Sequence, residues 1–409
     1  MFRQKPIFVI IFLVLIISAV LVSLTWINHR FSVKSPGGND FLARWMGARK
    51  WLMEGISPYD QRVSLATQEM IYGHTADLDR GEDLSHFVYP LTSMIFFAPF
   101  GLLDYLPARA LWMTVLELCV LILTIISMRL VRWQQKPVWV AALMLFSLLW
   151  YHGIRTIILG QFAAVEALLI AGALLLIEND QDIGAGILLT FSTSKPQMAF
   201  LIIPFVLIWA YSRHRFALIW SFFASFLGLL ALSLIFIPNW PLQMLMQIME
   251  YPSYTSRIGS LTSTLAAAIP GLKTQLNIGL QIALWGYLIV EWVLAWKKDE
   301  RWFFWTAMMT LVITNFVALR TATTNYIMLL PAFFLILKIW RQRWGSVGNS
   351  MAVFVLITFL ISLWLLFFKT VDVNIEQPIM YLPLPIFCLL GLWWVRWWAI
   401  HPVRFSNGD

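Results

Sequence analysis

Long apolar runs recur along the chain and are separated by short polar stretches. The first run, residues 7–27, is about as long as the roughly 20 residues that a spanning helix needs, and no small-residue cleavage site follows it. We therefore expect a retained transmembrane helix there rather than a signal peptide. Further runs predict spans at residues 108–128, 138–151, 161–177, 183–194, 197–211, 216–237, 274–296, 302–318, 324–339, 351–368 and 380–399.

Basic residues set the expected orientation of these spans. They precede the first run in "MFRQK" and recur in "RLVRWQQK", "YSRHR", "KKDER" and "RQRW". If all of these clusters are cytoplasmic, the spans alternate consistently and both termini lie inside. Residues 87–103 spoil that alternation if they cross, so they are interpreted as a partial or re-entrant helix, or as the start of a misassigned pair of helices. The pattern predicts an all-α, multi-pass membrane protein of about 12 helices, forming a single integral membrane domain over residues 1–409.

Composition agrees with this class and excludes others. Of the 409 residues, 60% are hydrophobic and 12% are charged, which is too apolar for a soluble domain. The formal net charge of +8 is explained by the cytoplasmic basic clusters, so no nucleic-acid partner is implied. Cys119 and Cys388 lie in apolar runs without metal-like spacing and are expected to be plain core residues.

The polar parts of the chain fall mainly on the predicted external side. They are the loop 28–86, a second loop 238–273, and short loops near residues 152–160, 195, 319–323 and 369–379. Residues 40–54 place their apolar and charged positions on opposite sides of a helix, as expected for a helix lying flat on the outer membrane surface. Asp40 begins this helix, where free amide groups favour an ionised carboxylate and Gly37 and Gly38 leave its approach open. A simple helix cap also explains it.

Several segments together carry a family resemblance. Asp40 after the first predicted helix is followed by "GARKWLMEGISPYD", "VYPLTSMIFFAPFGLLDYLPARALW", "GQFAAVEALLIAGALLLIENDQDIGAGILLTFSTSKPQMAFLIIP" and "LRTATTNYIMLLP". Their order and spacing resemble glycosyltransferase family 87, polytopic enzymes of the GT-C class. Leu91 stands where the family pattern often has a second proline after Tyr-Pro.

The resemblance implies an activity and a base. It implies transfer of a sugar, of mannose or pentose type, from a polyprenyl-phosphate donor to a hydroxyl of a glycan or glycolipid acceptor, with inversion, at the external face of the plasma membrane. An aspartate of the first external loop acts as the base in the family, and Asp40 is the matching position. No metal or other cofactor is predicted. The partners expected are the lipid-linked donor, the acceptor and the bilayer.

Such chemistry also needs positive charge for the departing phosphate. Lys195 interrupts an apolar stretch, where a lysine is costly unless it faces a polar cavity or an anion, and Arg320 lies in a short external loop. Both are predicted phosphate ligands, although ordinary loop positions also explain them. Arg44, one turn after Asp40, and Arg257 are further candidates, and a sugar pocket is predicted to include His86, Tyr89 and Gln161.

Other acidic residues carry weaker signals. Asp77 and Asp79 form an Asp-x-Asp pattern that can hold a metal and a nucleotide sugar, but an acidic, glycine-containing external stretch favours a solvated loop, and residues 70–86 are the expected flexible part. Three glutamates lie inside apolar runs and have no assigned role: Glu117, Glu166 and Glu291. A multi-spanning transporter or lipid flippase is the alternative function, favoured by helix number and by the short helices around Lys195.

Overall fold

The protein is built from helices. A computed structural model of the chain describes residues 5–35, 37–254, 259–371 and 376–401. In these ranges every regular element is a helix and there is no strand, so the predicted all-α class is confirmed. Six helices of the described residues are long and apolar enough to cross a membrane, or seven if one bent pair forms a single span.

The chain divides into two compact units. Unit 1 comprises residues 1–88, 94–118 and 157–161, and unit 2 comprises residues 89–93, 119–156 and 162–409. The helices that belong to unit 1, including α5, which continues into unit 2, are α1 (Lys5–Lys34), α2 (Asn39–Glu54), α3 (Gln61–Tyr72), η1 (Leu78–Arg80), α4 (Met94–Gly101) and α5 (Tyr105–Leu130).

Unit 2 holds the remaining helices. They are η2 (Leu91–Ser93), α6 (Pro137–Leu149), α7 (Tyr151–Leu159), α8 (Ala163–Glu178), α9 (Asp182–Phe191), η3 (Ser192–Ser194), α10 (Pro196–Ala199), α11 (Ile202–Ser212), α12 (Phe216–Phe236), α13 (Trp240–Tyr254), α14 (Leu261–Ala266), η4 (Pro270–Leu272), α15 (Lys273–Ala295), α16 (Glu300–Val317), η5 (Thr323–Leu329), α17 (Leu330–Thr370), η6 (Pro378–Tyr381) and α18 (Pro383–Ile400). The end of α7 lies in unit 1.

Helix lengths support fewer spans than the 12 predicted. Three of the predicted spans correspond to α8, α9 and α11, which have 16, 10 and 11 residues and are shorter than the roughly 20 that cross a bilayer directly. Two others, 324–339 and 351–368, fall largely in the 41-residue α17. Gly345 interrupts α17 with φ 53° and ψ −119°, so this element consists of two helices joined at a kink.

Residues 87–103 form no long helix. After an irregular start they make η2 and then α4, whose eight residues include Pro99. Eight residues rise only about 12 Å, less than half of the roughly 30 Å hydrocarbon core. The last turns of this segment therefore serve packing within unit 1 rather than a full crossing.

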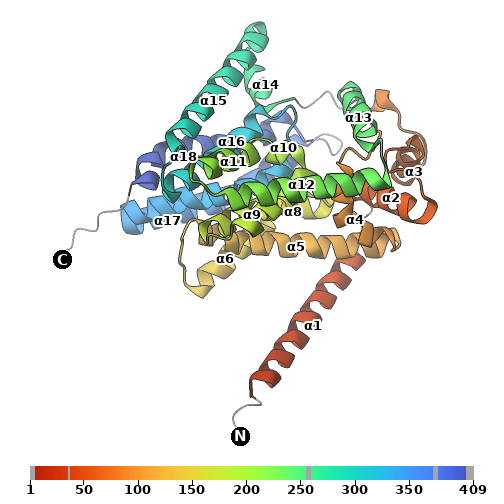
Figure 1. Ribbon diagram of the computed structural model, residues 1–409, viewed down its shortest axis with the longest axis horizontal. Coiled ribbons are helices and arrows are strands. Elements are labelled where there is room, and N and C mark those ends of the chain that lie inside the picture. The colour runs from red at the N-terminus through yellow and green to blue at the C-terminus, as the bar shows by residue number, and fades with distance from the viewer. Residues whose placement is uncertain (1–4, 36, 255–258, 372–375, 402–409) are drawn as a thin grey trace, which may run out of the picture. The chain divides into compact units, whose positions relative to one another are not determined.

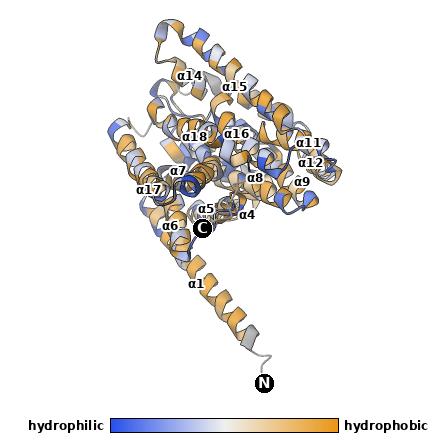
Figure 2. Cartoon of the chain, turned by 90° about the vertical axis from the view of Figure 1, so that its left-hand side faces the viewer, coloured by the Kyte–Doolittle hydropathy of each residue, from blue (hydrophilic) through white to orange (hydrophobic). Residues whose placement is uncertain are grey.

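Helix α1 of unit 1 exposes an apolar surface of the kind that lipid covers. Its residues from Phe8 to Ile17 are all exposed and apolar, and Figure 2 shows α1 orange along most of its length. A helix that is apolar on every side and covered by no protein is stable only in lipid. Together with the other exposed apolar helices, it makes the chain a multi-pass membrane protein.

Polar contacts join the second half of α1 to α5. Asn28 is buried and donates through Nδ2 to Glu117 Oε2 at 2.9 Å and to Thr114 Oγ1 at 3.1 Å. Thr25 Oγ1 lies 3.0 Å from the same Thr114 hydroxyl. Glu117, which had no evident partner in the sequence, is thus satisfied by a side chain 89 positions earlier.

Helix α2 packs its apolar side on α4. Phe41 and Trp45 are buried, and the Phe41 ring stacks on Trp112 of α5 with centroids 5.3 Å apart. Gly101 of α4 permits the close approach, since a Cβ there would lie 2.9 Å from the Ala48 carbonyl carbon. Most of the apolar face predicted to touch the membrane is therefore used inside unit 1, and Leu52 and Met53 near its end remain exposed.

In unit 2 the helices α8, α9 and α12 lie side by side, as Figure 1 shows, and α16 packs between its neighbours α11, α15 and α18. From Phe303 onward nearly every side chain of α16 is buried, and Trp305 donates its indole N–H to the Leu392 carbonyl of α18 at 3.1 Å. The threonines of this helix satisfy their hydroxyls on carbonyls one turn earlier, as Thr310 does on Thr306 at 2.8 Å. Polar side chains thereby fit inside an apolar bundle.

Loop contacts in unit 2 fall into two sets. Arg132 pairs with Glu178 and Glu300, which joins the predicted cytoplasmic turns. Arg155, by contrast, pairs with Glu376, which joins two of the predicted external loops. These contacts join loops within the same two groups that the alternation of basic residues predicts.

Candidate functional site

Asp40 is the second residue of α2. Gly38 caps that helix in a left-handed conformation, with φ 73° and ψ 31°, and makes no side-chain cap. The Asp40 side chain keeps 33% of its surface exposed and lies 3.9 Å from Nη1 of Arg44, whose side chain is 13% exposed. The helix thus presents a carboxylate that solvent or a hydroxyl can reach, with a largely buried guanidinium one turn behind it.

A second carboxylate, Asp83, lies beside this pair. Burial raises the pKa of Asp83; the Ser85 N–H, which donates to its Oδ1 at 2.6 Å, opposes this, and the Asp40 charge raises the pKa further. The charges of Arg44 and His86 act on it as well, in the lowering direction. Asp40, Arg44, Asp83 and His86 therefore form one electrostatic cluster in unit 1, the acidic cluster.

The chain around Asp83 is held by hydrogen bonds. The Tyr72 hydroxyl accepts from the Asp83 backbone N–H at 2.9 Å, and Gln68 donates to the Leu84 carbonyl at 2.8 Å. His86, which is 9% exposed, lies with Nδ1 2.7 Å from the Ser64 hydroxyl. Residues 70–86 thus differ from the flexible loop that their composition predicts, because α3 supplies partners for their backbone.

Replacing Asp83 with asparagine is expected to change the pH dependence of stability. A carboxyl whose pKa is raised on folding contributes stability that is full below its unfolded value of 3.8 and is lost as pH rises through the raised pKa. The amide mimics the protonated form. Asp83→Asn is thus expected to become more stable relative to wild type as the pH rises above 3.8, measured by unfolding of the purified protein in detergent.

Asp60→Asn is the control of opposite sign. The Asp60 side chain caps α3 and receives a hydrogen bond from Arg62, which lowers its pKa. Its stabilising contribution is present above its usual pKa and is lost as pH falls. The asparagine variant should lose stability relative to wild type as pH rises, and parallel profiles for the two variants would contradict the assignment of Asp83.

Gly37 and Gly38 are held by α5 rather than left open. The Tyr105 hydroxyl donates to the Gly37 carbonyl at 2.6 Å, and Arg109 donates through Nη1 to the Ser35 carbonyl at 2.8 Å. A Cβ at Gly38 would lie 2.6 Å from Arg109 Nε. The glycines therefore allow close packing of the chain on Arg109 immediately before Asp40, which differs from the open approach expected from the sequence.

Gly38→Ala is expected to destabilise unit 1 more than Gly73→Ala. Both glycines have nearly the same positive φ, 73° and 74°, so each alanine incurs a conformational cost of roughly 1–2 kcal/mol. A Cβ at Gly73 meets nothing within 4 Å, whereas at Gly38 it clashes with Arg109, which adds about 1–3 kcal/mol. Chemical unfolding in detergent measures the difference, and equal losses would show that the close packing costs nothing.

Lys195, in unit 2, follows η3 and begins α10. It is 2% exposed, and its charge attracts the carboxylate of Glu166 on α8, which is completely buried. No neighbour of Glu166 could be predicted from the sequence, because 29 positions separate it from Lys195 and only the packing of α8 against η3 and α10 brings the two together. The structure thus places Lys195 beside a buried carboxyl group.

The other predicted site residues have varied surroundings. Arg320 is partly exposed, just before η5. Tyr89 is buried and meets Phe162 edge to face, with centroids 6.0 Å apart. Gln161, partly exposed, lies between α7 and α8. Arg257 lies outside the described residues.

A carboxylate that sequence reasoning did not single out is Glu376. Its side chain is 8% exposed and accepts from the Tyr151 hydroxyl at 2.6 Å, from Arg155 Nε at 3.1 Å and from the Thr323 hydroxyl at 2.7 Å. The donors come from α7 and the start of η5, so this cluster ties three polar segments of unit 2 together. In the sequence, the only sign of this cluster is that the loops it joins are all predicted to be external.

The remaining acidic residues have structural contacts. Asp77 accepts the Asp79 N–H at 3.0 Å and pairs with Arg80 at 3.1 Å, as a residue capping a short turn does. Glu291 receives two hydrogen bonds from Arg396, at 3.0 and 2.9 Å. Both cysteines are free and buried.

A comparison with protein-family profiles gives a match over much of the chain. The profile of glycosyltransferase family 87 matches residues 87–321, more than half of the chain, and this range includes Tyr89, Gln161, Lys195 and Arg320. The acidic cluster lies just before it. No curated protein and no solved structure matches the chain. The profile match shows that the chain belongs to glycosyltransferase family 87 and is a membrane glycosyltransferase.

Proposed function

We propose that this membrane glycosyltransferase, of the GT-C type, transfers a sugar from a polyprenyl-phosphate donor to an acceptor hydroxyl at the external face of the plasma membrane. The sugar is of mannose or pentose type, and the acceptor is a glycan or glycolipid. The observation that carries the proposal is the partly exposed Asp40 carboxylate, set at the start of α2 with Arg44 behind it. A lipid-linked donor suits a multi-pass membrane protein because it reaches the enzyme through the bilayer.

The reaction we infer is a single displacement with inversion. The acceptor oxygen forms a bond to the anomeric carbon while the bond from that carbon to the phosphate oxygen breaks. Asp40 takes the hydroxyl proton, and the polyprenyl phosphate leaves as an anion. A positioned base contributes about 10²–10⁴-fold to such a step.

The acidic cluster suits the acceptor side of this reaction. The charge of Arg44 is close to both Asp40 and Asp83, and its guanidinium group lies 3.9 Å from the Asp40 carboxylate. Asp83, with its raised pKa, supplies a neighbouring hydrogen-bonding group that can be protonated near the base. His86, with its Nδ1 fixed by Ser64, completes the polar surroundings that an acceptor sugar would meet.

In unit 2 we assign the donor phosphate to Lys195 and Arg320. Lys195 carries positive charge in an otherwise apolar setting, where an anion is attracted more strongly than in water. The buried Glu166 lies close enough for its carboxyl group and Lys195 to interact electrostatically. Tyr89 and Gln161 are assigned to the sugar pocket, and Arg44 and Arg257 remain further candidate phosphate ligands.

The test is sugar transfer in membranes containing the protein. Radiolabelled polyprenyl-phosphate mannose, polyprenyl-phosphate pentose and nucleotide sugars are offered in parallel, and product is measured for wild type, Asp40→Asn and Asp79→Asn. We expect transfer from one lipid-linked donor, lost in Asp40→Asn and kept in Asp79→Asn. Transfer from nucleotide sugars that depends on Asp79 would overturn the donor class, and no transfer from any donor would favour a transporter.

A further inference from the structure

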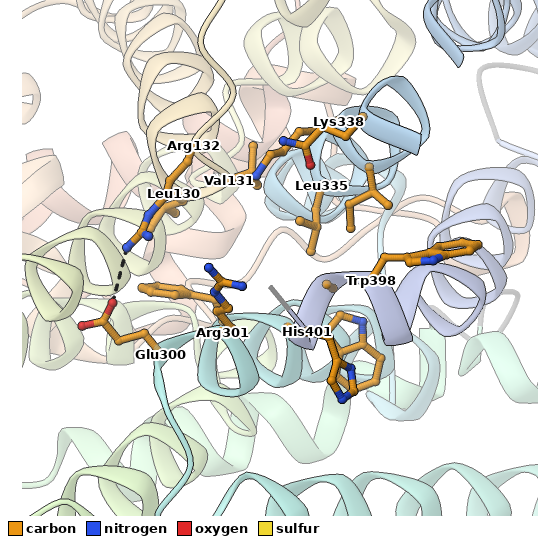
Figure 3. A pocket seen from close by; sticks show the side chains of 14 residues that line it. Leu130, Val131, Arg132, Glu300, Arg301, Leu335, Lys338, Trp398 and His401 are labelled. Carbon is orange, nitrogen blue, oxygen red and sulfur yellow. Dashed lines mark hydrogen bonds and ion pairs between the residues drawn. The ribbon is translucent and has the colours of Figure 1, made fainter. Parts of the chain in front are cut away.

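Unit 2 contains a hollow that is lined by none of the residues assigned to sugar transfer. It measures about 270 Å³ and lies where α5 ends, α16 begins, α17 approaches its kink and α18 ends. Figure 3 shows the side chains of Arg132, just after α5, of Arg301 on α16 and of Lys338 on α17 around it. None of these basic residues belongs to the acidic cluster or is assigned to the donor phosphate.

The charges around the hollow are unequally compensated. Arg132 is paired twice, with Glu178 at 2.8 Å and with Glu300 at 3.4 Å. Arg301 and Lys338 form neither a hydrogen bond nor an ion pair with another residue of the described ranges. Lys338 is partly buried, and the positive charges of Arg132 and Arg301 both act on its ammonium group. Like charges gathered in a partly buried place are unfavourable unless an anion joins them.

The other walls of the hollow are mainly apolar and aromatic, with Glu300, Gln342 and His401 as further polar residues. Phe304, Leu335, Ile339 and Trp398 line it beside the cations. A second hollow, on the Gly345 side of α17, adds Lys136 and Arg341 to the basic surface of unit 2. The combination of fixed cations with apolar walls is typical of a site for an anionic group attached to a less polar body.

We propose that this hollow binds the phosphate group of a phosphate monoester or diester. Arg301 and Lys338 contact the phosphate oxygens directly, and Arg132, held by its two glutamates, adds positive charge at the rim. A phosphate fits better than a single carboxylate because its several oxygens can accept from two separate cationic groups at once. The ligand is either the headgroup of an anionic phospholipid or a soluble phosphate compound, and the apolar walls favour the lipid.

The experiment uses the full chain purified in neutral detergent. Binding of phosphatidylglycerol and phosphatidylcholine, offered together in equal amounts, is measured by native mass spectrometry. Thermal unfolding is followed in parallel with inorganic phosphate or chloride at the same ionic strength. Wild type is expected to prefer phosphatidylglycerol about tenfold, the effect of roughly one charge-assisted hydrogen bond.

Arg301→Gln and the double variant with Lys338→Gln are expected to lose this preference. Arg301 is exposed, so the single variant should fold even if the double variant does not. Lys298→Gln is the matched control, since it removes the same charge from a residue that stacks on Trp302 and does not line the hollow.

The outcomes distinguish a phospholipid headgroup from a soluble phosphate compound as the ligand. Binding of phosphatidylglycerol without stabilisation by inorganic phosphate supports a lipid headgroup, and stabilisation by inorganic phosphate that Arg301→Gln abolishes supports a soluble phosphate. A wild type with neither response, or a folded Arg301→Gln variant with wild-type responses, would overturn the proposal. So would an equal loss in Lys298→Gln, because net charge alone would then explain the effect.

Discussion

Replacing Asp40 with asparagine is expected to lower the rate of sugar transfer by about 10²- to 10⁴-fold at saturating donor, with little change in protein stability. The amide has nearly the shape of the carboxylate but cannot take up the hydroxyl proton. Asp40 is partly exposed and its ion pair with Arg44 is long, at 3.9 Å, so the fold does not depend on its charge. The measurement is kcat for the best lipid-linked donor, at matched amounts of folded protein.

Two further variants separate chemistry from positioning. Asp40→Glu keeps a base but moves it by one methylene, so part of the activity should remain. Asp83→Asn should keep much more activity than Asp40→Asn, because Asp83 is the more buried neighbour and not the proposed base. If Asp40→Asn transfers sugar at the wild-type rate, Asp40 is not the base and the acidic cluster is structural.

Replacing Lys195 with methionine is expected to destabilise the protein by about 3–5 kcal/mol, because the completely buried Glu166 then loses the positive charge beside it. Loss of activity in this variant alone would therefore say nothing about the donor phosphate. The measurement is the free energy of unfolding of the purified protein in detergent, together with the yield of folded protein.

The double variant Glu166→Gln with Lys195→Met resolves this ambiguity. It removes both charges from the buried place, so stability should return to within about 1–2 kcal/mol of wild type. If Lys195 binds the donor phosphate, the folded double variant should show a raised KM for the lipid-linked donor. A double variant that folds and transfers sugar normally would limit Lys195 to neutralising Glu166.

Much of the fold follows from the sequence because its signals are local. The start of α2 is set by Gly38, which adopts a left-handed conformation, and its apolar positions recur at helical spacing, so its bounds were predicted within about one residue. Charge alternation left no room for residues 87–103 as a further span, and the structure forms only the short helices η2 and α4 there. Family membership likewise followed from the order of several motifs, and the profile match confirms it.

The number of spans and the partners of the polar side chains depend on contacts between residues that are far apart in the sequence. Hydropathy does not reveal that protein covers most side chains of α8, or that this helix is only 16 residues long. Glu376 lies 225 residues from Tyr151, and no periodicity relates the two. The same holds for Asp83, whose proximity to Asp40 depends on how residues 74–86 fold back on α3.

The contacts of Asn28 with Glu117 and Thr114 give α1 a fixed rotational register. If α1 turned by one residue, about 100°, Asn28 would face lipid and the Glu117 carboxyl would lose its partner. This register is carried through Ser35 and Gly38, both held by α5, to the first turn of α2. An unrelated apolar helix of equal length would still insert the chain in the membrane, but it would not fix the direction in which Asp40 points.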